Sequence, residues 1–361
     1  MKRYVASLKV CALMSLTIGL ALFLSATMVF SQEQVIAEGT TISAAQLHAV
    51  QQVQRNHEAQ FFSMPGIIGL GIGLADRGDE LALHVYLNVG VPGASHGAIP
   101  QQVNGVPVQI VESDEFTARD AGPAHRLQYN LPVPMGVSTS NDNGCFAGTL
   151  GARVFRKGNS SRVGYITNNH VAAAGGANLC PNSAIFGEDQ FQRSRLDNNC
   201  SLTGLKKIGD LIQFIPIVFG GAIENTVDAA FVLSSRNLVK KTILDIGNPS
   251  AAILEPALNM PVQKSGRTTG QTFGTITTIN ATVTVGYGAC GSAKFVNQML
   301  ITPGGFSAAG DSGSLILHKT SKDSSNRFKP VGLLFAGSST ITVGNRISDV
   351  LGALSSIIDT F

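Results

Sequence analysis

Apolar and polar residues alternate with a period of two in several segments of this chain. Between residues 67 and 74, isoleucines and leucines alternate with glycines, and residues 81–89 again carry an apolar side chain at every second position. This is the period of a β-strand with one buried face. Because the polar segment 76–80 separates the two runs, we expect a hairpin, followed by a further strand at 106–111.

A helical period precedes the hairpin, in residues 43–62. Ser43 and Gln46 have the spacing of a capping box. The apolar residues that fall near one face of this helix are Leu47, Val50, Val53 and Phe61. Together, the helix and the strands predict a small α+β module. Its glycines alternate within a strand and no helix follows them, so they do not indicate a nucleotide-binding loop.

The pattern changes after a proline-containing connector at 117–135. Short strand-like runs separated by turns then continue for over 200 residues, at 162–171, 228–235, 274–285, 314–318 and 330–337. The end of the chain, 347–361, predicts a final amphipathic helix. Strands at this spacing with almost no helix between them predict an antiparallel sandwich or barrel.

The N-terminus has the composition of a secretory signal. Three basic residues, Lys2, Arg3 and Lys9, precede a charge-free apolar run at 10–30. We expect cleavage after Ser31, which makes the protein secreted or periplasmic and leaves it without a membrane contact. A retained membrane anchor is the alternative.

Net charge indicates no polyanionic partner. The chain has 26 basic and 23 acidic residues, and the three basic residues of the signal account for the excess. The mature chain is therefore neutral and has no basic cluster, so nucleic acid is not an expected partner.

The cysteines predict disulfides in an exported protein. Cys11 lies in the signal, which leaves Cys145, Cys180, Cys200 and Cys290. An even number favours two disulfides, with three pairings open. We prefer Cys180–Cys200, which closes a short loop, with Cys145–Cys290 as the remainder. No two of the four have metal-ligand spacing, so no metal is expected.

A candidate nucleophile lies in the segment Gly310-Asp311-Ser312-Gly313, just before an apolar run. A serine needs a base, and the base needs an acid that orients it. Among the histidines, His170 is favoured because it ends an apolar strand. Asp228, one charge entering a small apolar strand, is the favoured acid. Asp210, in what looks like a surface turn, is the competitor.

The chain order of these residues is His170, Asp228, Ser312, which is not the order of an α/β-hydrolase or of a subtilisin. The blocks TNNHV, VDAAF and GDSGS resemble the signatures of trypsin-like (chymotrypsin-fold) serine peptidases over residues 135–361. Residues 264–277 resemble the bacterial secreted branch, that of α-lytic protease and the streptogrisins. The preceding module resembles the N-terminal extension of bacterial relatives of narrow-leaf-type peptidases.

The resemblance implies two antiparallel six-stranded β-barrels of the chymotrypsin fold with a C-terminal helix, after a small α+β module. The expected domains are a signal peptide at 1–31, the module at 32–120, a linker at 121–135 and the peptidase at 136–361.

The resemblance also implies roles for single residues. His170 would be the general base, Asp228 its orienting acid and Ser312 the nucleophile. The backbone N–H groups of Gly310 and Ser312 would form the oxyanion hole. The specificity pocket would have Phe306 at its base and Phe335, Ala336 and Gly337 along one wall, which favours small or medium apolar substrate residues.

Asp311 would be a buried carboxylate that needs a cation. No activation site of the trypsin type precedes residue 136. Arg267 is the predicted partner, as in the bacterial branch, because a guanidinium binds a carboxylate through two parallel hydrogen bonds. A solvated Arg267 in a turn is the alternative.

Together these inferences predict a secreted serine endopeptidase that acts on peptide or protein substrates and needs no cofactor. The alternative is a weakly active or inactive secreted binding protein that retains the fold. The oligomeric state is left open. For the N-terminal module, we favour an inhibitory or folding role.

Overall fold

The computed structural model describes residues 42–76, 80–117 and 124–361. It confirms the predicted fold class, since antiparallel strands dominate and helices are few. The predicted signal peptide at 1–31 lies outside these ranges. Among the described helices, none combines the length and the apolar composition that a bilayer crossing requires.

The first barrel is built from residues that follow the predicted linker. Its strands pair in the order β10, β14, β12, β11, β7, β8. Two residues after β8 the chain enters β9, which pairs with β10. The ring therefore closes, with β8 and β9 as two halves of one strand. The bounds are β7 (Ser138–Asn141), β8 (Gly148–Thr149), β9 (Ala152–Arg156), β10 (Asn159–Thr167), β11 (Asp189–Gln192), β12 (Lys206–Phe214) and β14 (Ala230–Leu233).

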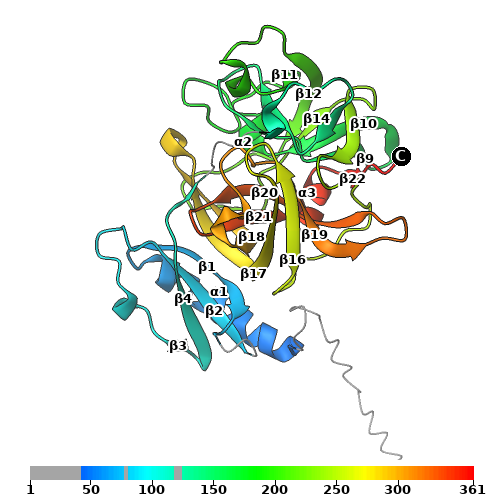
Figure 1. Cartoon of the computed structure of the whole chain (residues 1–361). Coiled ribbons are helices and arrows are strands. Elements are labelled where there is room, and N and C mark those ends of the chain that lie inside the picture. The colour runs from blue at the N-terminus through cyan, green and yellow to red at the C-terminus, as the bar shows by residue number, and fades with distance from the viewer. Residues whose placement is uncertain (1–41, 77–79, 118–123) are drawn as a thin grey trace, which may run out of the picture. The chain divides into compact units, whose positions relative to one another are not determined.

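The second barrel closes through six consecutive antiparallel pairings. The order β17, β16, β19, β20, β21, β18 returns to β17, and Figure 1 shows these strands curled around one another. The bounds are β16 (Pro261–Gly266), β17 (Gly270–Gly286), β18 (Ser292–Thr302), β19 (Leu315–Lys322), β20 (Phe328–Gly337) and β21 (Thr342–Arg346). A short strand, β13 (Glu224–Asn225), is added beside β18.

The N-terminal module has the predicted elements. Helix α1 (Ala44–Phe62) begins with the capping box, in which Ser43 and Gln46 bond reciprocally. The hairpin is formed by β1 (Ile67–Leu74) and β2 (Leu81–Leu87), and β4 (Val106–Glu112) pairs in parallel with β2. A two-residue strand, β3 (Gln102–Val103), completes this edge.

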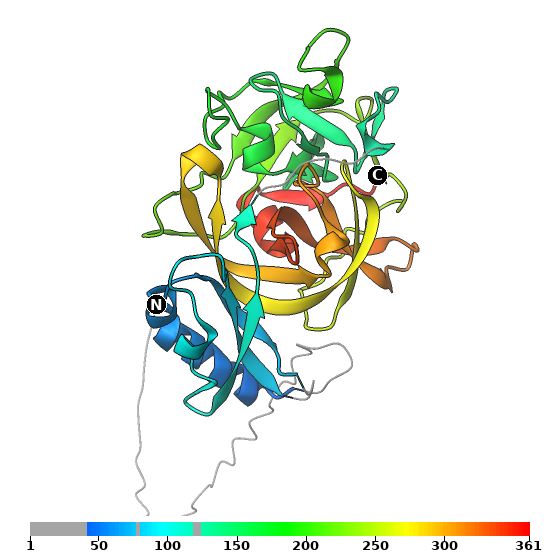
Figure 2. The same cartoon turned by 60° about the vertical axis from the view of Figure 1, so that its left-hand side comes forward.

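The sheet of the module continues that of the second barrel. Strand β1 pairs antiparallel with β17 from Gly69 opposite Val283 to Gly73 opposite Thr278. In Figure 2 the long curved β17, in yellow, runs beside the blue strands of the module. This pairing covers the part of β17 that extends beyond its pairing with β16, where backbone groups would otherwise be unpaired. Nothing in the pattern of residues 67–74 had indicated it.

Two segments differ from their predicted form. The C-terminal helix is confirmed as α3 (Ile347–Ala353), but it ends early, and β22 (Ser356–Ile358) pairs with β9 instead. Within the predicted linker, β6 (Val133–Met135) is buried and pairs in parallel with β15 (Val239–Ile243). Both differences follow from apolar side chains that pack into the first barrel.

Candidate active site

His170 lies immediately after β10, in the one-turn helix α2 (Asn169–Ala172) rather than at the end of a strand. The turn starts at Asn168, whose carbonyl accepts the N–H of Ala172 at 2.9 Å. The side-chain amide of Asn168 donates to the carbonyl of Asp228 at 2.7 Å. The turn is thereby fixed against the segment that carries the predicted acid.

Asp228 is fully buried and contacts His170 twice. Its Oδ2 lies 2.6 Å from Nδ1 of the imidazole, and its Oδ1 accepts the backbone N–H of His170 at 3.2 Å. The competing acid, Asp210, lies on β12 with its side chain 41% exposed and pairs with Lys207. The buried carboxylate therefore fixes both the ring and the backbone of the histidine, whereas Asp210 belongs to the surface.

The turn around Ser312 requires its glycines. Gly310 and Gly313 have φ angles of 91° and 95°, which L side chains rarely adopt. A Cβ on Gly313 would also clash with the carbonyl of Thr149 and the hydroxyl of Thr167. The glycines thus let the Ser312 segment approach the first barrel closely.

The backbone of the turn that contains Ser312 and Gly313 is bonded to both barrels. Its carbonyl accepts the N–H of Thr149 at 2.8 Å, and the N–H of Gly313 donates to Leu334 at 2.8 Å. The Thr167 hydroxyl, three residues before His170, donates to the carbonyl of Thr149. Ser312 and His170 are therefore held by the same part of the first barrel.

The hydroxyl of Ser312 donates to the carbonyl of Phe335 at 3.4 Å. Among the described residues no hydrogen bond joins it to His170. The N–H groups of Gly310 and Ser312, which are the predicted oxyanion donors, form no hydrogen bond with another described residue. The catalytic roles of these residues stay predictions.

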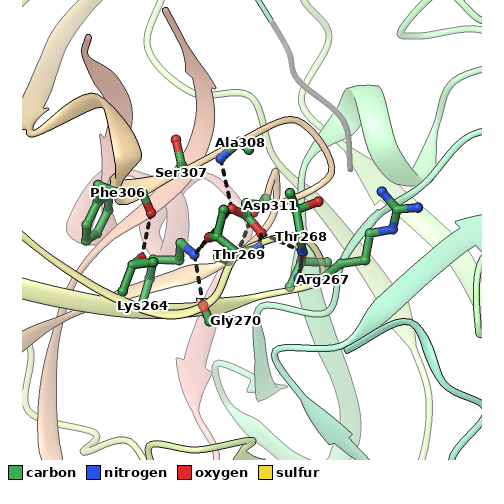
Figure 3. Close-up of polar contacts among 12 residues, drawn as sticks. Lys264, Arg267, Thr268, Thr269, Gly270, Phe306, Ser307, Ala308 and Asp311 are labelled. Atoms are coloured by element: carbon green, nitrogen blue, oxygen red, sulfur yellow. Dashed lines mark hydrogen bonds and ion pairs between the residues drawn. The ribbon is translucent and has the colours of Figure 1, made fainter. Parts of the chain in front are cut away.

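Asp311 is enclosed by donors, as Figure 3 shows. Its carboxylate accepts the N–H groups of Thr268 at 2.7 Å, Thr269 at 3.1 Å and Ala308 at 3.0 Å, together with the Thr269 hydroxyl. The cation beside it is Lys264, with Nζ at 3.2 Å and both side chains inaccessible to solvent. Burial lowers the pKa of Lys264, and the Asp311 charge opposes this shift.

The predicted pairing of Arg267 with Asp311 is wrong. The guanidinium points away from Asp311 in Figure 3 and binds Asp197 of the first barrel, with Nη2–Oδ1 at 2.6 Å and Nε–Oδ2 at 3.1 Å. Burial disfavours the ionised form of Asp197, but hydrogen bonds from Arg267, Ser138 and Ser194 hold its pKa below the ordinary value. Arg267 therefore links the two barrels.

Local geometry explains this exchange of partners. Lys264 lies on β16 with its side chain directed into the protein, whereas Arg267 lies in the turn between β16 and β17 and leaves it in another direction. The segment 264–270 does hold Asp311, as the motif suggested. It does so through the lysine, two backbone N–H groups and the Thr269 hydroxyl rather than through the arginine.

Both preferred disulfide pairs are also wrong. The structure joins Cys145 to Cys200 and Cys180 to Cys290, with Cα–Cα distances of 5.0 and 5.6 Å. Cys180 lies in the loop that follows α2, and its partner Cys290 lies in the turn after β17, so closeness in sequence to Cys200 did not bring those two cysteines together. The predicted number of two disulfides is confirmed.

Sequence reasoning missed two side chains that contact Asp228 from the second barrel. Tyr287, just after β17, donates its hydroxyl to Oδ2 at 2.9 Å, and the Asn345 side chain on β21 accepts the Asp228 N–H at 3.0 Å. Neither residue belongs to a recognisable motif. Only the closure of the barrel brings them to Asp228.

The predicted pocket residues are all buried. Phe306 packs into the core of the second barrel, and the Nζ of Lys264 lies 5.9 Å from the centre of its ring. Phe335 and Ala336 belong to a separate apolar cluster at the far end of β20. Their role in substrate choice stays a prediction. Among described residues, no cluster of His, Cys, Asp and Glu could hold a metal ion.

Comparison with known proteins gives structural likeness only. No protein-family model matches the chain, and no curated protein matches it. Among the solved structures that resemble it are serine proteases. They include a glutamic acid-specific serine protease (17% identity, TM-score 0.42), Cellulomonas bogoriensis chymotrypsin (18%, 0.40) and a Nocardiopsis protease (16%, 0.40). Each alignment covers 63% of this chain and 99–100% of the other.

Proposed function

We propose that this protein is an exported serine endopeptidase that cleaves peptide bonds through an acyl-enzyme. The observation that carries the proposal is the 2.6 Å contact between Nδ1 of His170 and the buried Asp228 carboxylate. It leaves Nε2 of the imidazole to take the proton of Ser312. Ser312 attacks the peptide carbonyl, and the N–H groups of Gly310 and Ser312 stabilise the oxyanion. The C–N bond then breaks, and the amine leaves with the proton that His170 took from the serine, so the acyl group stays on Ser312. Water then releases the acyl group.

The test is labelling of the protein, produced without residues 1–31, by a fluorophosphonate. We expect one probe per chain on Ser312, and no label on Ser312→Ala. Ser314→Ala is the control, because it removes a neighbouring hydroxyl that donates to the Asp311 carbonyl and not to a reacting group. If the folded protein remains unlabelled, the binding-protein alternative takes precedence. A labelled protein that cleaves esters but no peptide would be an esterase.

A second proposal concerns the N-terminal module, which we infer to occlude the substrate groove. The module strand β5 (Phe116–Thr117) pairs antiparallel with β20, Thr117 lying opposite Gly337. Its other neighbour is β17, in parallel. Gly337 is two residues beyond Phe335, whose carbonyl accepts the Ser312 hydroxyl. An extended peptide adds to a sheet through such an edge, so β5 and a substrate compete for it.

Side chains reinforce this contact. Phe116 is fully buried in the apolar cluster that contains Phe335 and Ala336. The hydroxyl of Ser113 donates to Ser338 at 2.7 Å, and that of Ser339 donates to Asp114. The module thus covers the edge of β20 and the residues that follow it.

Thr117→Pro should therefore raise peptide turnover. Proline removes the N–H of the paired residue and restricts its backbone, while α1 and the β1–β17 pairing hold the module in place. If release of β5 weakens its competition by 1–2 kcal/mol, kcat/KM for a peptide should rise by about 5- to 30-fold. Thr117→Ser is the matched control. Equal turnover in the proline and serine variants would contradict occlusion.

A further inference from the structure

We propose that Tyr287 is a positioning residue of the active site, whose hydroxyl holds the Asp228 carboxylate in the orientation that binds His170. This inference rests on the proposed function. Its central observation is that one oxygen, Oδ2 of Asp228, accepts from both Nδ1 of His170 at 2.6 Å and the Tyr287 hydroxyl at 2.9 Å. The two donors reach it from different barrels.

The second donor has a chemical consequence for the carboxylate. Asp228 is fully buried, and a buried charge is costly unless donors surround it. Its Oδ1 has the backbone N–H of His170, and Oδ2 has the imidazole and the phenol. Among the described residues, the tyrosine therefore supplies the one donor to this carboxylate that does not come from the histidine itself. It holds the carboxylate in a fixed orientation while the imidazole gains and loses its proton.

Tyr287 can act only as a donor to this oxygen. Burial and the adjacent Asp228 charge hold the pKa of its phenol well above 10, so the hydroxyl stays protonated through the range in which a histidine titrates. A phenolate here would place a second negative charge beside Asp228.

The ring of Tyr287 is fixed by its neighbours. It packs edge-on against His170, with ring centres 5.9 Å apart, and meets Phe219 at 5.7 Å and Phe295 at 6.3 Å. The tyrosine also touches the imidazole directly, so it constrains the base through both the ring and the shared carboxylate.

A disulfide ties the backbone of Tyr287 to the histidine segment. The tyrosine N–H donates to Gly291 at 2.9 Å, which closes a turn that contains Cys290. Cys290 forms a disulfide with Cys180. The backbone of Cys180 forms an antiparallel β-bridge with Gly175, which lies just beyond α2. The disulfide thus connects the turn that follows Tyr287 to the loop that follows the His170 turn.

Tyr287→Phe tests the proposal because it keeps the ring and removes only the hydroxyl. Without this donor, more of the Asp228 charge acts on the imidazolium. The pH dependence of acylation should then move toward higher pH than in the wild type. The rate of fluorophosphonate acylation at pH 8 should fall about tenfold, with little change in the apparent affinity for the probe. NMR of labelled histidine and the pH dependence of acylation measure these effects.

Tyr165→Phe is the matched control. Tyr165 is a buried tyrosine of β10 whose ring belongs to the core of the first barrel. It should leave the pH dependence and the rate of acylation as in the wild type. A second variant, with both Cys180 and Cys290 replaced by alanine, should shift the pH dependence of acylation in the same direction as Tyr287→Phe.

The outcomes separate this inference from the proposed function. If the wild type is not acylated, the peptidase proposal fails, and the NMR titration of His170 still decides whether Tyr287 acts on the pair. If the wild type is acylated and Tyr287→Phe matches it in rate and pH dependence, the positioning role is refuted. A loss of rate with an unshifted pH dependence would indicate only packing and would also overturn the proposal.

Discussion

Asp228→Asn should lower the rate of Ser312 acylation by about 10⁴-fold. The Asp228 carboxylate faces donors on both oxygens, the His170 N–H on Oδ1 and the imidazole with the Tyr287 hydroxyl on Oδ2. An asparagine must turn its NH₂ group toward one of these sides. Placed at Oδ2, it forces Nδ1 to accept, which puts the ring proton on Nε2, where it cannot take the proton of the serine.

Stopped-flow or gel-based measurement of fluorophosphonate acylation gives the rate, and circular dichroism verifies the fold. Asp210→Asn is the matched control because Asp210 is exposed and paired with Lys207. It should react like the wild type. If Asp228→Asn were acylated like the wild type while Asp210→Asn were not, the orienting acid would be Asp210 rather than Asp228.

Lys264→Met should lower the free energy of unfolding by about 3–5 kcal/mol, because it strands a buried carboxylate. Lys264 supplies the cation for Asp311, which is fully buried beside Ser312. Without it, we also expect slower acylation, since the four remaining donors must hold Asp311 and the Gly310–Ser312 turn alone. Urea unfolding and the acylation rate measure the two effects.

Two comparisons make this prediction specific. Lys207→Met removes a lysine that pairs with two carboxylates, Asp189 and Asp210, but whose side chain is 47% exposed, so it should cost less than about 1 kcal/mol. The double variant Lys264→Met with Asp311→Asn removes both charges and should recover much of the lost stability. If Lys264→Met proves as stable as Lys207→Met, Lys264 is not the required partner of Asp311.

Features that depend on a few neighbouring residues followed from the sequence. The capping box at Ser43 and Gln46, the alternating strands and the glycines at 310 and 313 all express local sterics or a fixed period. Burial of Asp228 was also foreseeable, because a lone charge entering an apolar strand needs a partner. Its meeting with His170 follows from the chain order of the signature blocks, which reflects a resemblance rather than a derivation.

Choices between partners came only with the tertiary structure. Lys264 and Arg267 are three residues apart, and both are basic. The Lys264 side chain leaves strand β16 toward Asp311, whereas the Arg267 side chain leaves the following turn toward Asp197. The same holds for the disulfides, for Tyr287 on Asp228 and for β5 on β20. Each depends on segments more than fifty residues apart that barrel closure brings within bonding distance. The amino-acid sequence indicates which side chains need a partner, and the closed barrels determine which partner is near enough to bind.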